Sequence, residues 1–165
     1  MQVARNTVVS LDVELWDIWG NLMERSPEPL QYLHGGYGDI FPAIESALDG
    51  LSPQTGADVR VRLEPEGAFG DYDETLLRVE LRSRFPEGLE IGMKFEGEQG
   101  SGDEGRLFTV TDMAEDKVVL DANHPLSGMA LEFRCRIVAI RRATESEIDN
   151  RSADDPRSVI MRVLP

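Results

Sequence analysis

Apolar and polar residues alternate with a period of two in several short stretches of this chain, and this pattern constrains its fold more than any other feature. In residues 8–15 the apolar positions are Val9, Leu11, Val13 and Leu15, with polar or acidic residues between them. Such alternation is typical of a half-buried β-strand. The pattern recurs at residues 59–64, 77–82, 91–96, 106–113, 117–122 and 131–137. The chain is therefore predicted to form mainly short strands.

One longer helix is predicted, over residues 40–51. Its apolar residues share one face, Pro42 lies near its start, and Gly50 can end it. Thr144 and Glu147 have the spacing of a capping box, which predicts a further helical turn there. The order strand, loop, helix, strand, loop, β insertion, strand favours an α+β fold, an antiparallel sheet wrapped over one short helix.

Composition limits the possible partners and compartments. The 165 residues suffice for one domain, or one domain with a small insertion. The net charge of −14 repels phosphate backbones, so we expect no nucleic-acid partner. No apolar run is long enough to span a membrane, and the N-terminus lacks the apolar segment of a signal peptide, so we expect a cytoplasmic protein. The single cysteine, Cys135, is expected to be a small buried apolar residue.

The four short strands between residues 76 and 121 are enough for a separate small β unit. One interpretation is that the apolar positions of this unit simply fill its interior. A unit of about 45 residues has little room for a core, however, so some of this apolar surface is expected to stay open. The candidates for this open apolar surface are Leu77, Val79, Leu81, Ile91, Met93 and Phe95.

Signatures of acid–base, nucleotide or metal chemistry are absent from the sequence. There is no Gly-rich phosphate loop, no CxxC pair and no HExxH, and neither His34 nor His124 has a second ligand at metal spacing. We therefore expect no cofactor and no metal. What remains is a set of aromatic residues in loops and at strand edges, with the two histidines beside them: Tyr32, Phe41, Phe69, Tyr72 and Phe133.

With these motifs the sequence resembles the SlyD branch of the FKBP-type peptidyl-prolyl cis-trans isomerases, from Val8 to Ile148. The resemblance lies in VVSLDVEL, PLQYLHG, IESALDG, AFGDYDE and DANHPLSGMALEFRCRIVAIRRAT. It implies an FKBP-like core formed by residues 1–74 and 122–149, and an insert-in-flap domain formed by residues 75–121. Residues 150–165 would be a C-terminal tail.

The resemblance also implies two activities: isomerisation of X-Pro bonds in the core, and chaperone activity of the insert toward unfolded polypeptides. Isomerisation needs no acid, base or nucleophile, only a dry pocket that fits the twisted imide better than the planar one. The implied catalytic residues are Phe69, Glu24, Phe41, Ile44, Phe133 and His124, with Glu24 at the rim of the pocket and His124 at its far wall. The implied substrate-binding residues are Val13, Met23, Leu30, Ile40, Tyr32, Tyr72 and Leu126. His34 is interpreted as fixing its loop through its ring N–H groups rather than as a base.

Several positions depart from the family pattern. Val13 and Phe69 stand where relatives usually carry tyrosine, and the second of those hydroxyls normally meets the substrate carbonyl. Glu24 replaces an aspartate, and Ala43 replaces a helix glycine. The tail lacks the His- and Cys-rich sequence that binds metal in some relatives, which disfavours a nickel metallochaperone.

These departures leave an alternative open: an FKBP-fold chaperone or peptide-binding module with weak or lost isomerase activity. The expected partners are unfolded or proline-containing polypeptides, and we expect a monomer. Val163-Leu164-Pro165 is an apolar segment that ends in proline, and it is a hypothetical ligand for a prolyl pocket, against the alternative of a disordered or docked end.

Overall fold

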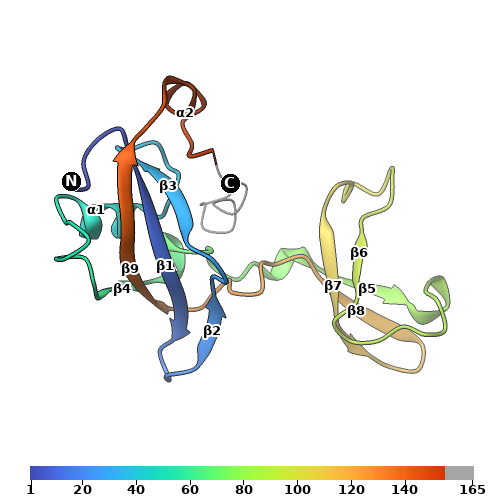
Figure 1. The fold of residues 1–165 in the computed structure, drawn as a ribbon. Helices are drawn as coiled ribbons and strands as arrows, with labels where there is room; N and C mark the ends of the chain where they lie inside the picture. The colour runs from blue at the N-terminus through green and yellow to red at the C-terminus, as the bar shows by residue number, and fades with distance from the viewer. Residues whose placement is uncertain (155–165) are drawn as a thin grey trace. The chain divides into compact units, whose positions relative to one another are not determined.

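The computed structural model describes residues 1–154, which form two compact units (Figure 1). Of the described residues, unit 1 consists of residues 1–71 and 128–154, and unit 2 consists of residues 72–127. The tail segment Val163-Leu164-Pro165 lies outside the described residues.

Unit 1 is built on a five-stranded antiparallel sheet with the strand order β2-β1-β9-β4, in which β3 also pairs with β1. The strands are β1 (Thr7–Asp17), β2 (Leu22–Arg25), β3 (Leu30–His34), β4 (Val59–Leu63) and β9 (Leu131–Arg142). The pair β1 and β9, which come from opposite ends of the chain, lie side by side from Thr7↔Arg142 to Asp17↔Leu131 (Figure 1). The predicted α+β fold class is confirmed.

The helix α1 (Pro42–Leu48) supplies the other side of the core. Pro42 occupies the first turn, where its missing N–H costs nothing, and Ile44 and Leu48 are completely buried. The predicted alternation places one face of β1 and of β9 in this core, and Cys135 is buried among these residues as expected. The helix contacts β4.

Two details of the strand prediction were wrong. Leu30–His34 forms a strand that the alternation did not reveal, because Leu33 is buried on the opposite face, against Val8 and Ala153. The strand expected over residues 91–96 is only Lys94–Glu96. Gly92 has a φ of 97°, which breaks the extended backbone before β6 begins.

Unit 2 is a four-stranded antiparallel sheet with the order β5-β8-β7-β6. Its strands are β5 (Leu77–Leu81), β6 (Lys94–Glu96), β7 (Leu107–Met113) and β8 (Lys117–Asp121). Short 3-10 turns at Glu74–Leu76 and Arg82–Arg84 flank β5, and a third, Pro65–Gly67, lies in unit 1. The core of unit 2 contains Leu89, Phe108, Val110, Val118 and Leu120, with Phe85, Phe95, Met113 and Ala122 packed against it.

The last helix, α2 (Glu145–Asn150), begins with the predicted capping box between Thr144 and Glu147. The Glu147 carboxylate is buried and accepts two hydrogen bonds from Arg141, at 2.8 and 2.9 Å. It also accepts the backbone N–H groups of Thr144 at 3.0 Å and Asp154 at 2.9 Å. These donors, Arg141 above all, lower the pKa of Glu147 to about 2.

Beyond α2, buried Asp39 holds the chain to the core. Its carboxylate accepts the Ser152 hydroxyl at 3.0 Å and the Ala153 N–H at 2.9 Å, and it also accepts the N–H of Leu33 at 2.8 Å. Neither described helix is long or apolar enough to cross a membrane.

The Glu147 network predicts an acid-sensitive contribution to stability. A carboxylate whose folded-state pKa lies below its ordinary value of 4.5 stabilises the fold above that value, and the contribution is lost as the pH falls toward 2. We expect Glu147→Gln to lower the free energy of unfolding by roughly 2–3 kcal/mol at neutral pH. Urea unfolding at pH 7 and at pH 3 measures this. Glu145→Gln, at an exposed position in the same helical turn, is the matched control and should change little. Equal effects of the two substitutions would contradict the prediction.

Candidate functional site

One wall of the candidate pocket is formed by β1, β3 and the segment that leads into α1. Val13, Leu30, Tyr32 and Ile40 are buried and line a common crevice of about 10 Å³, in which Leu11 also takes part. The pairing of Leu11 with Leu30 fixes β3 beside β1 at this point. Four of the predicted substrate-binding residues therefore lie together.

The family resemblance assigns the floor of the pocket to aromatic and aliphatic residues. Phe41, Ile44 and Phe133 are each completely buried. Phe133 lies in the middle of the sheet, opposite Leu15 of β1 and Val61 of β4, so its ring is fixed by strands on both sides.

Phe69 lies against this floor. Its ring meets the ring of Phe41 edge to face, with the centroids 5.3 Å apart and the planes at 88°. The Phe69 ring follows the Pro65–Gly67 turn, and the Gly70 N–H donates to the Pro65 carbonyl at 2.8 Å to close that turn. Gly70 has a φ of 82°, so glycine suits this position. The turn therefore determines where the Phe69 side chain points.

Met23 and Glu24 lie on β2, the edge strand beside β1. All four residues of β2 are exposed, and Glu24 pairs with Leu15. A carboxylate at this edge is in water, where its charge costs little. The predicted position of Glu24 at the rim of the pocket stays a prediction.

Tyr32, His34 and Asp49 form a hydrogen-bonded chain beneath the pocket wall. The Tyr32 oxygen lies 2.8 Å from His34 Nδ1, and His34 Nε2 lies 2.9 Å from Asp49 Oδ1. Burial raises the pKa of Tyr32 far above its usual range, so its hydroxyl keeps its proton and can pair with Nδ1. The Asp49 carboxylate accepts the hydrogen bond from Nε2. The Tyr32 contact orients the imidazole within β3, and the Asp49 contact joins β3 to the end of α1, in agreement with the positioning role predicted for His34.

Three of the predicted catalytic and substrate-binding residues belong to unit 2. Tyr72 donates its hydroxyl to Asp121 at 3.0 Å. His124 lies in a turn where its Nδ1 accepts the N–H of Leu126 at 3.1 Å. Because Nδ1 accepts, the imidazole carries no proton at that atom. The contribution of His124 and Leu126 to the far wall of the pocket stays a prediction. Within residues 1–154, no three His, Cys, Asp or Glu side chains lie close enough together to hold a metal ion.

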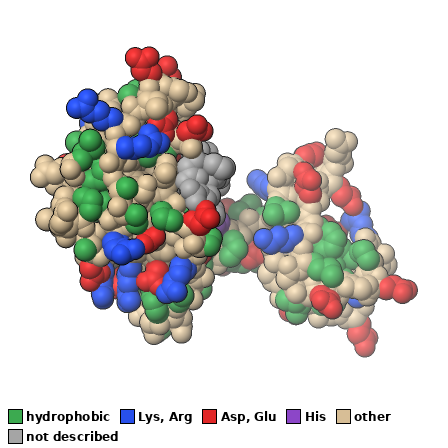
Figure 2. All heavy atoms as spheres, in the orientation of Figure 1, with side chains coloured by type: hydrophobic (Ala, Val, Ile, Leu, Met, Phe, Trp, Pro, Cys, Tyr) green, Lys and Arg blue, Asp and Glu red, His purple; other side chains and the backbone are tan. Residues whose placement is uncertain are grey.

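The apolar residues predicted to bind polypeptide divide into two groups. Val79, Leu81, Ile91 and Met93 are exposed, by 62%, 56%, 64% and 39% respectively. Phe95, in contrast, packs against the core of unit 2, and Leu77 is half-buried. Figure 2 shows apolar side chains at the surface of unit 2 bordered by acidic groups.

Two residues of these sites were not predicted. Leu107 is 57% exposed on β7, although its sequence, RLFTVTDM, suggested only an ordinary strand. The signal was its position, since it lies one residue out of phase with buried Phe108 and Val110. Asp49 gave no signal, because nothing in the sequence connects it to His34, fifteen residues earlier.

Comparison with known proteins agrees with this fold. No protein-family model matches the chain. It is 34% identical over 152 residues to the FKBP-type peptidyl-prolyl cis-trans isomerase SlyD of Treponema pallidum, an alignment that covers 90% of this chain and 84% of that protein. It is 37% identical over 153 residues to SlyD of Escherichia coli K12, covering 90% and 75%, and 37% identical over 155 residues to SlyD of Yersinia pestis, covering 91% and 76%.

The fold is therefore the α+β fold of the FKBP class. Within that class, the chain belongs to the SlyD-type peptidyl-prolyl cis-trans isomerases.

The Tyr32–His34–Asp49 chain generates a prediction about stability. Tyr32→Phe keeps the ring but leaves a buried imidazole nitrogen without its donor, so it should lower the free energy of unfolding by about 1–3 kcal/mol. Urea unfolding is the measurement. Tyr37→Phe is the matched control. The Tyr37 side chain is half-buried and its hydroxyl donates to Asn6, so water can replace this partner. The loss of unfolding free energy should therefore be smaller. A larger loss of unfolding free energy for Tyr37→Phe would contradict a stabilising role of the Tyr32–His34–Asp49 hydrogen bonds.

Proposed function

We propose that unit 1 isomerises X-Pro peptide bonds of polypeptides at the pocket formed by Val13, Leu30, Ile40, Phe41, Ile44, Phe69 and Phe133. The observation that carries this proposal is the edge-to-face contact of Phe69 with buried Phe41, and the burial of the other apolar residues supports it. Family membership supports it, since the relatives are named peptidyl-prolyl isomerases.

The chemistry follows from the amide itself. Rotation about the C–N bond has a barrier of roughly 18–20 kcal/mol because conjugation is lost when the bond twists. The twisted imide has less charge separation than the planar one, so an apolar site from which water is excluded favours it. No proton has to move and no covalent intermediate forms. Buried aromatic and aliphatic side chains therefore perform the chemistry by shape and low polarity.

The individual residues would act as follows. Phe41, Ile44 and Phe133 form the floor that receives the proline ring, and Phe69 packs over it. Met23 and Glu24, on the exposed β2 edge, would contact the chain on either side of the proline. We assign the far wall to His124 and Leu126 on the basis of the family resemblance. Tyr32 would shape the wall through its ring, since its hydroxyl is held by His34.

We further propose that unit 2 holds unfolded polypeptide. Arg78 and Glu80 lie on the face of the sheet that contains Phe108 and Leu120. Successive side chains of a strand point to opposite faces, so Leu77, Val79 and Leu81 lie on the other face. That face of β5 is apolar and exposed, contrary to the usual arrangement of an edge strand, which supports a role in binding.

The departure at position 69 gives the test of the isomerase proposal. Phe69→Tyr restores the hydroxyl that most relatives carry, and a neutral hydrogen bond contributes about 0.5–1.5 kcal/mol. We expect kcat/KM toward a proline-containing tetrapeptide to rise a few-fold and at most about tenfold. A protease-coupled assay measures it, and the activity should be independent of pH between 6 and 8.

Phe41→Tyr is the matched control for adding a hydroxyl to this ring pair. Phe41 is fully buried, so its extra oxygen should destabilise the fold without raising activity. A protein without isomerase activity that Phe69→Tyr fails to improve would overturn the proposal and favour a peptide-binding module.

Deletion of unit 2 tests the chaperone proposal. The Gly128 N–H donates to the Gly70 carbonyl at 2.8 Å, so the two ends of unit 1 lie beside each other and a short Gly-rich bridge can join them. We expect the deletion of residues 72–127 to leave a folded unit 1 by circular dichroism, with loss of its ability to suppress aggregation of a reduced, denatured client. The full chain carrying Val79→Ser and Leu81→Ser should lose part of that ability, whereas Thr111→Ser, at another exposed position of the unit, should keep it. Undiminished suppression after the deletion would show that unit 2 is not the binding surface.

A further inference from the structure

Unit 2 contains a groove that is separate from its exposed apolar face. The groove has a volume of about 280 Å³. Its floor is formed by Phe85, Phe95, Phe108 and Leu120, and the rings of Phe85 and Phe95 meet edge to face with their centroids 5.3 Å apart. A space of this size suits one or two large side chains rather than a whole drug-sized ligand.

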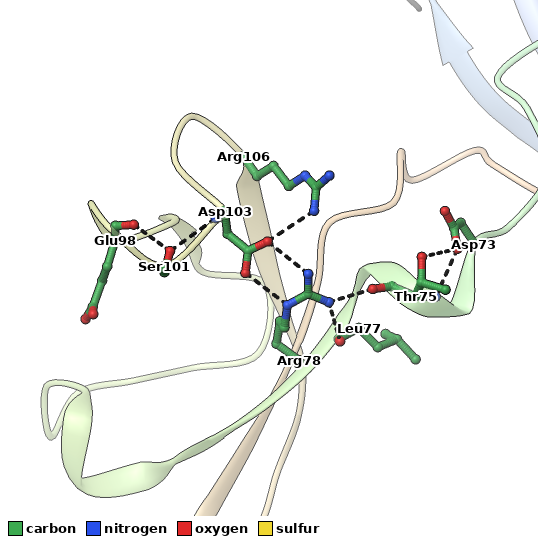
Figure 3. Close-up of polar contacts among 8 residues, drawn as sticks. All are labelled: Asp73, Thr75, Leu77, Arg78, Glu98, Ser101, Asp103 and Arg106. Atoms are coloured by element: carbon green, nitrogen blue, oxygen red, sulfur yellow. Dashed lines mark hydrogen bonds and ion pairs between the residues drawn. The ribbon is translucent and has the colours of Figure 1, made fainter.

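A network of polar contacts holds one wall of the groove in place (Figure 3). Arg78 binds Asp103 through two hydrogen bonds of 2.9 Å, and Arg106 adds a third at 3.1 Å. The Arg78 guanidinium also donates to the Leu77 carbonyl at 2.9 Å and lies over the ring of Phe108, 5.9 Å from its centroid. Asp103 lies in a loop, and this paired geometry attaches the loop to Arg78 near the start of β5.

The same loop packs closely against the residue that follows β6. A Cβ atom on Gly97 would come within 2.0 Å of the Asp103 carbonyl oxygen, so the backbone passes there at a distance that only glycine allows. Gly97 and Glu104 form a bridge that spans the base of the loop. The groove is therefore a built feature of unit 2.

The charges at the rim are unbalanced. Two guanidinium groups line the groove, Arg78 and Arg84. Arg78 is neutralised by Asp103, and Arg84 is shared between Glu80 at 2.8 Å and Glu98 at 3.7 Å. Glu96 adds a further carboxylate to the lining. Four carboxylates thus face two cations, within a unit whose thirteen acidic and six basic residues give a formal charge of −7.

We propose that this groove binds a segment of unfolded polypeptide in which a large apolar side chain is flanked by lysine or arginine. The inference deepens the proposed chaperone function and rests on it. The apolar side chain packs on the ring pair Phe85 and Phe95, and the flanking cations meet the excess carboxylates at Glu96 and Glu98. Arginine or lysine beside these half-buried aromatic rings gains a cation–π contribution as well. A segment flanked by acidic residues is repelled by the same rim.

Two labelled, proline-free peptides test the proposal on the full chain. Both contain the centre Leu-Phe-Leu, one with two lysines on each side and the other with two glutamates. Fluorescence anisotropy at low ionic strength should show at least tenfold tighter binding of the lysine peptide, and the difference should shrink strongly in 0.5 M salt because the Debye length falls to a few ångström (about 3–5 Å). Equal affinities, or tighter binding of the glutamate peptide, would overturn the proposal.

Charge-neutralising variants locate the preference. Glu96→Gln with Glu98→Gln should remove most of the difference between the peptides. Glu87→Gln with Glu90→Gln changes the net charge equally at exposed positions outside the groove and should leave the difference intact. If both double variants reduce the difference alike, the preference belongs to the charge of the whole unit and the groove is not its source.

Amide chemical-shift mapping of the unsubstituted protein avoids any effect of a variant on folding. The lysine peptide should shift the resonances of residues 95–98 and of Phe85, and shifts confined to Val79 and Leu81 would place it on the other face.

The failure of this inference is distinguishable from that of the proposed function. A protein that suppresses aggregation but binds both peptides equally lacks only the charge preference, whereas a protein that does not suppress aggregation lacks the chaperone function itself.

Discussion

The pairing of β1 with β9 is the interaction on which the rest of unit 1 depends. The strands pair from Thr7↔Arg142 to Asp17↔Leu131. This pairing joins a segment that precedes unit 2 in the sequence to a segment that follows it. Strand β9 also lies between β1 and β4 and is the only strand that connects them in the sheet order. The row Leu15, Phe133 and Val61 exists only when all three strands are in register, and a shift by one residue would turn Phe133 away from the core. The position of Phe133, which we propose as part of the pocket floor, thus depends on a long-range contact.

Sequence reasoning was most reliable where one physical signal acted alone. Alternation located β1 and β9 because each has one buried face, and the Thr144–Glu147 spacing located the cap of α2 because the contact is local. It failed at β3, where burial on both faces removes the alternation, and at residues 91–93, where the positive φ of Gly92 overrides an apolar pattern. The pocket residues came from the family resemblance, since apolar core residues look alike in any fold. The Tyr32–His34–Asp49 chain could not be predicted in full, because Asp49 lies beside His34 only in the folded protein and no sequence pattern links the two residues.

The charge of the chain fits a molecule with exposed apolar surface. An edge strand with outward-facing Val79 and Leu81 is a hazard, because a second chain can pair with it. Here the strand is only five residues long, and charged residues stand between its apolar ones and opposite Leu77 and Leu81, where Asp121 and Lys117 pair with them. The net charge of −14 adds repulsion between copies. These charges therefore oppose pairing of β5 with a second copy while its apolar face stays exposed.

Unit 2 shows how a small unit can remain folded while keeping such surfaces open. Fifty-six residues cannot bury a large core, and a better-filled interior would close the groove above Phe85 and Phe95. The Arg78–Asp103 pair offers a different source of order, since a bidentate ion pair with only 31% and 16% of its side chains exposed fixes loop geometry without occupying the apolar floor. Its hydrogen bond and charge lower the pKa of Asp103 and raise that of Arg78, so the pair stays ionised over the physiological range. Polar contacts at the wall thus substitute for apolar contacts that the floor leaves unmade, so the unit keeps its fold while the groove stays open.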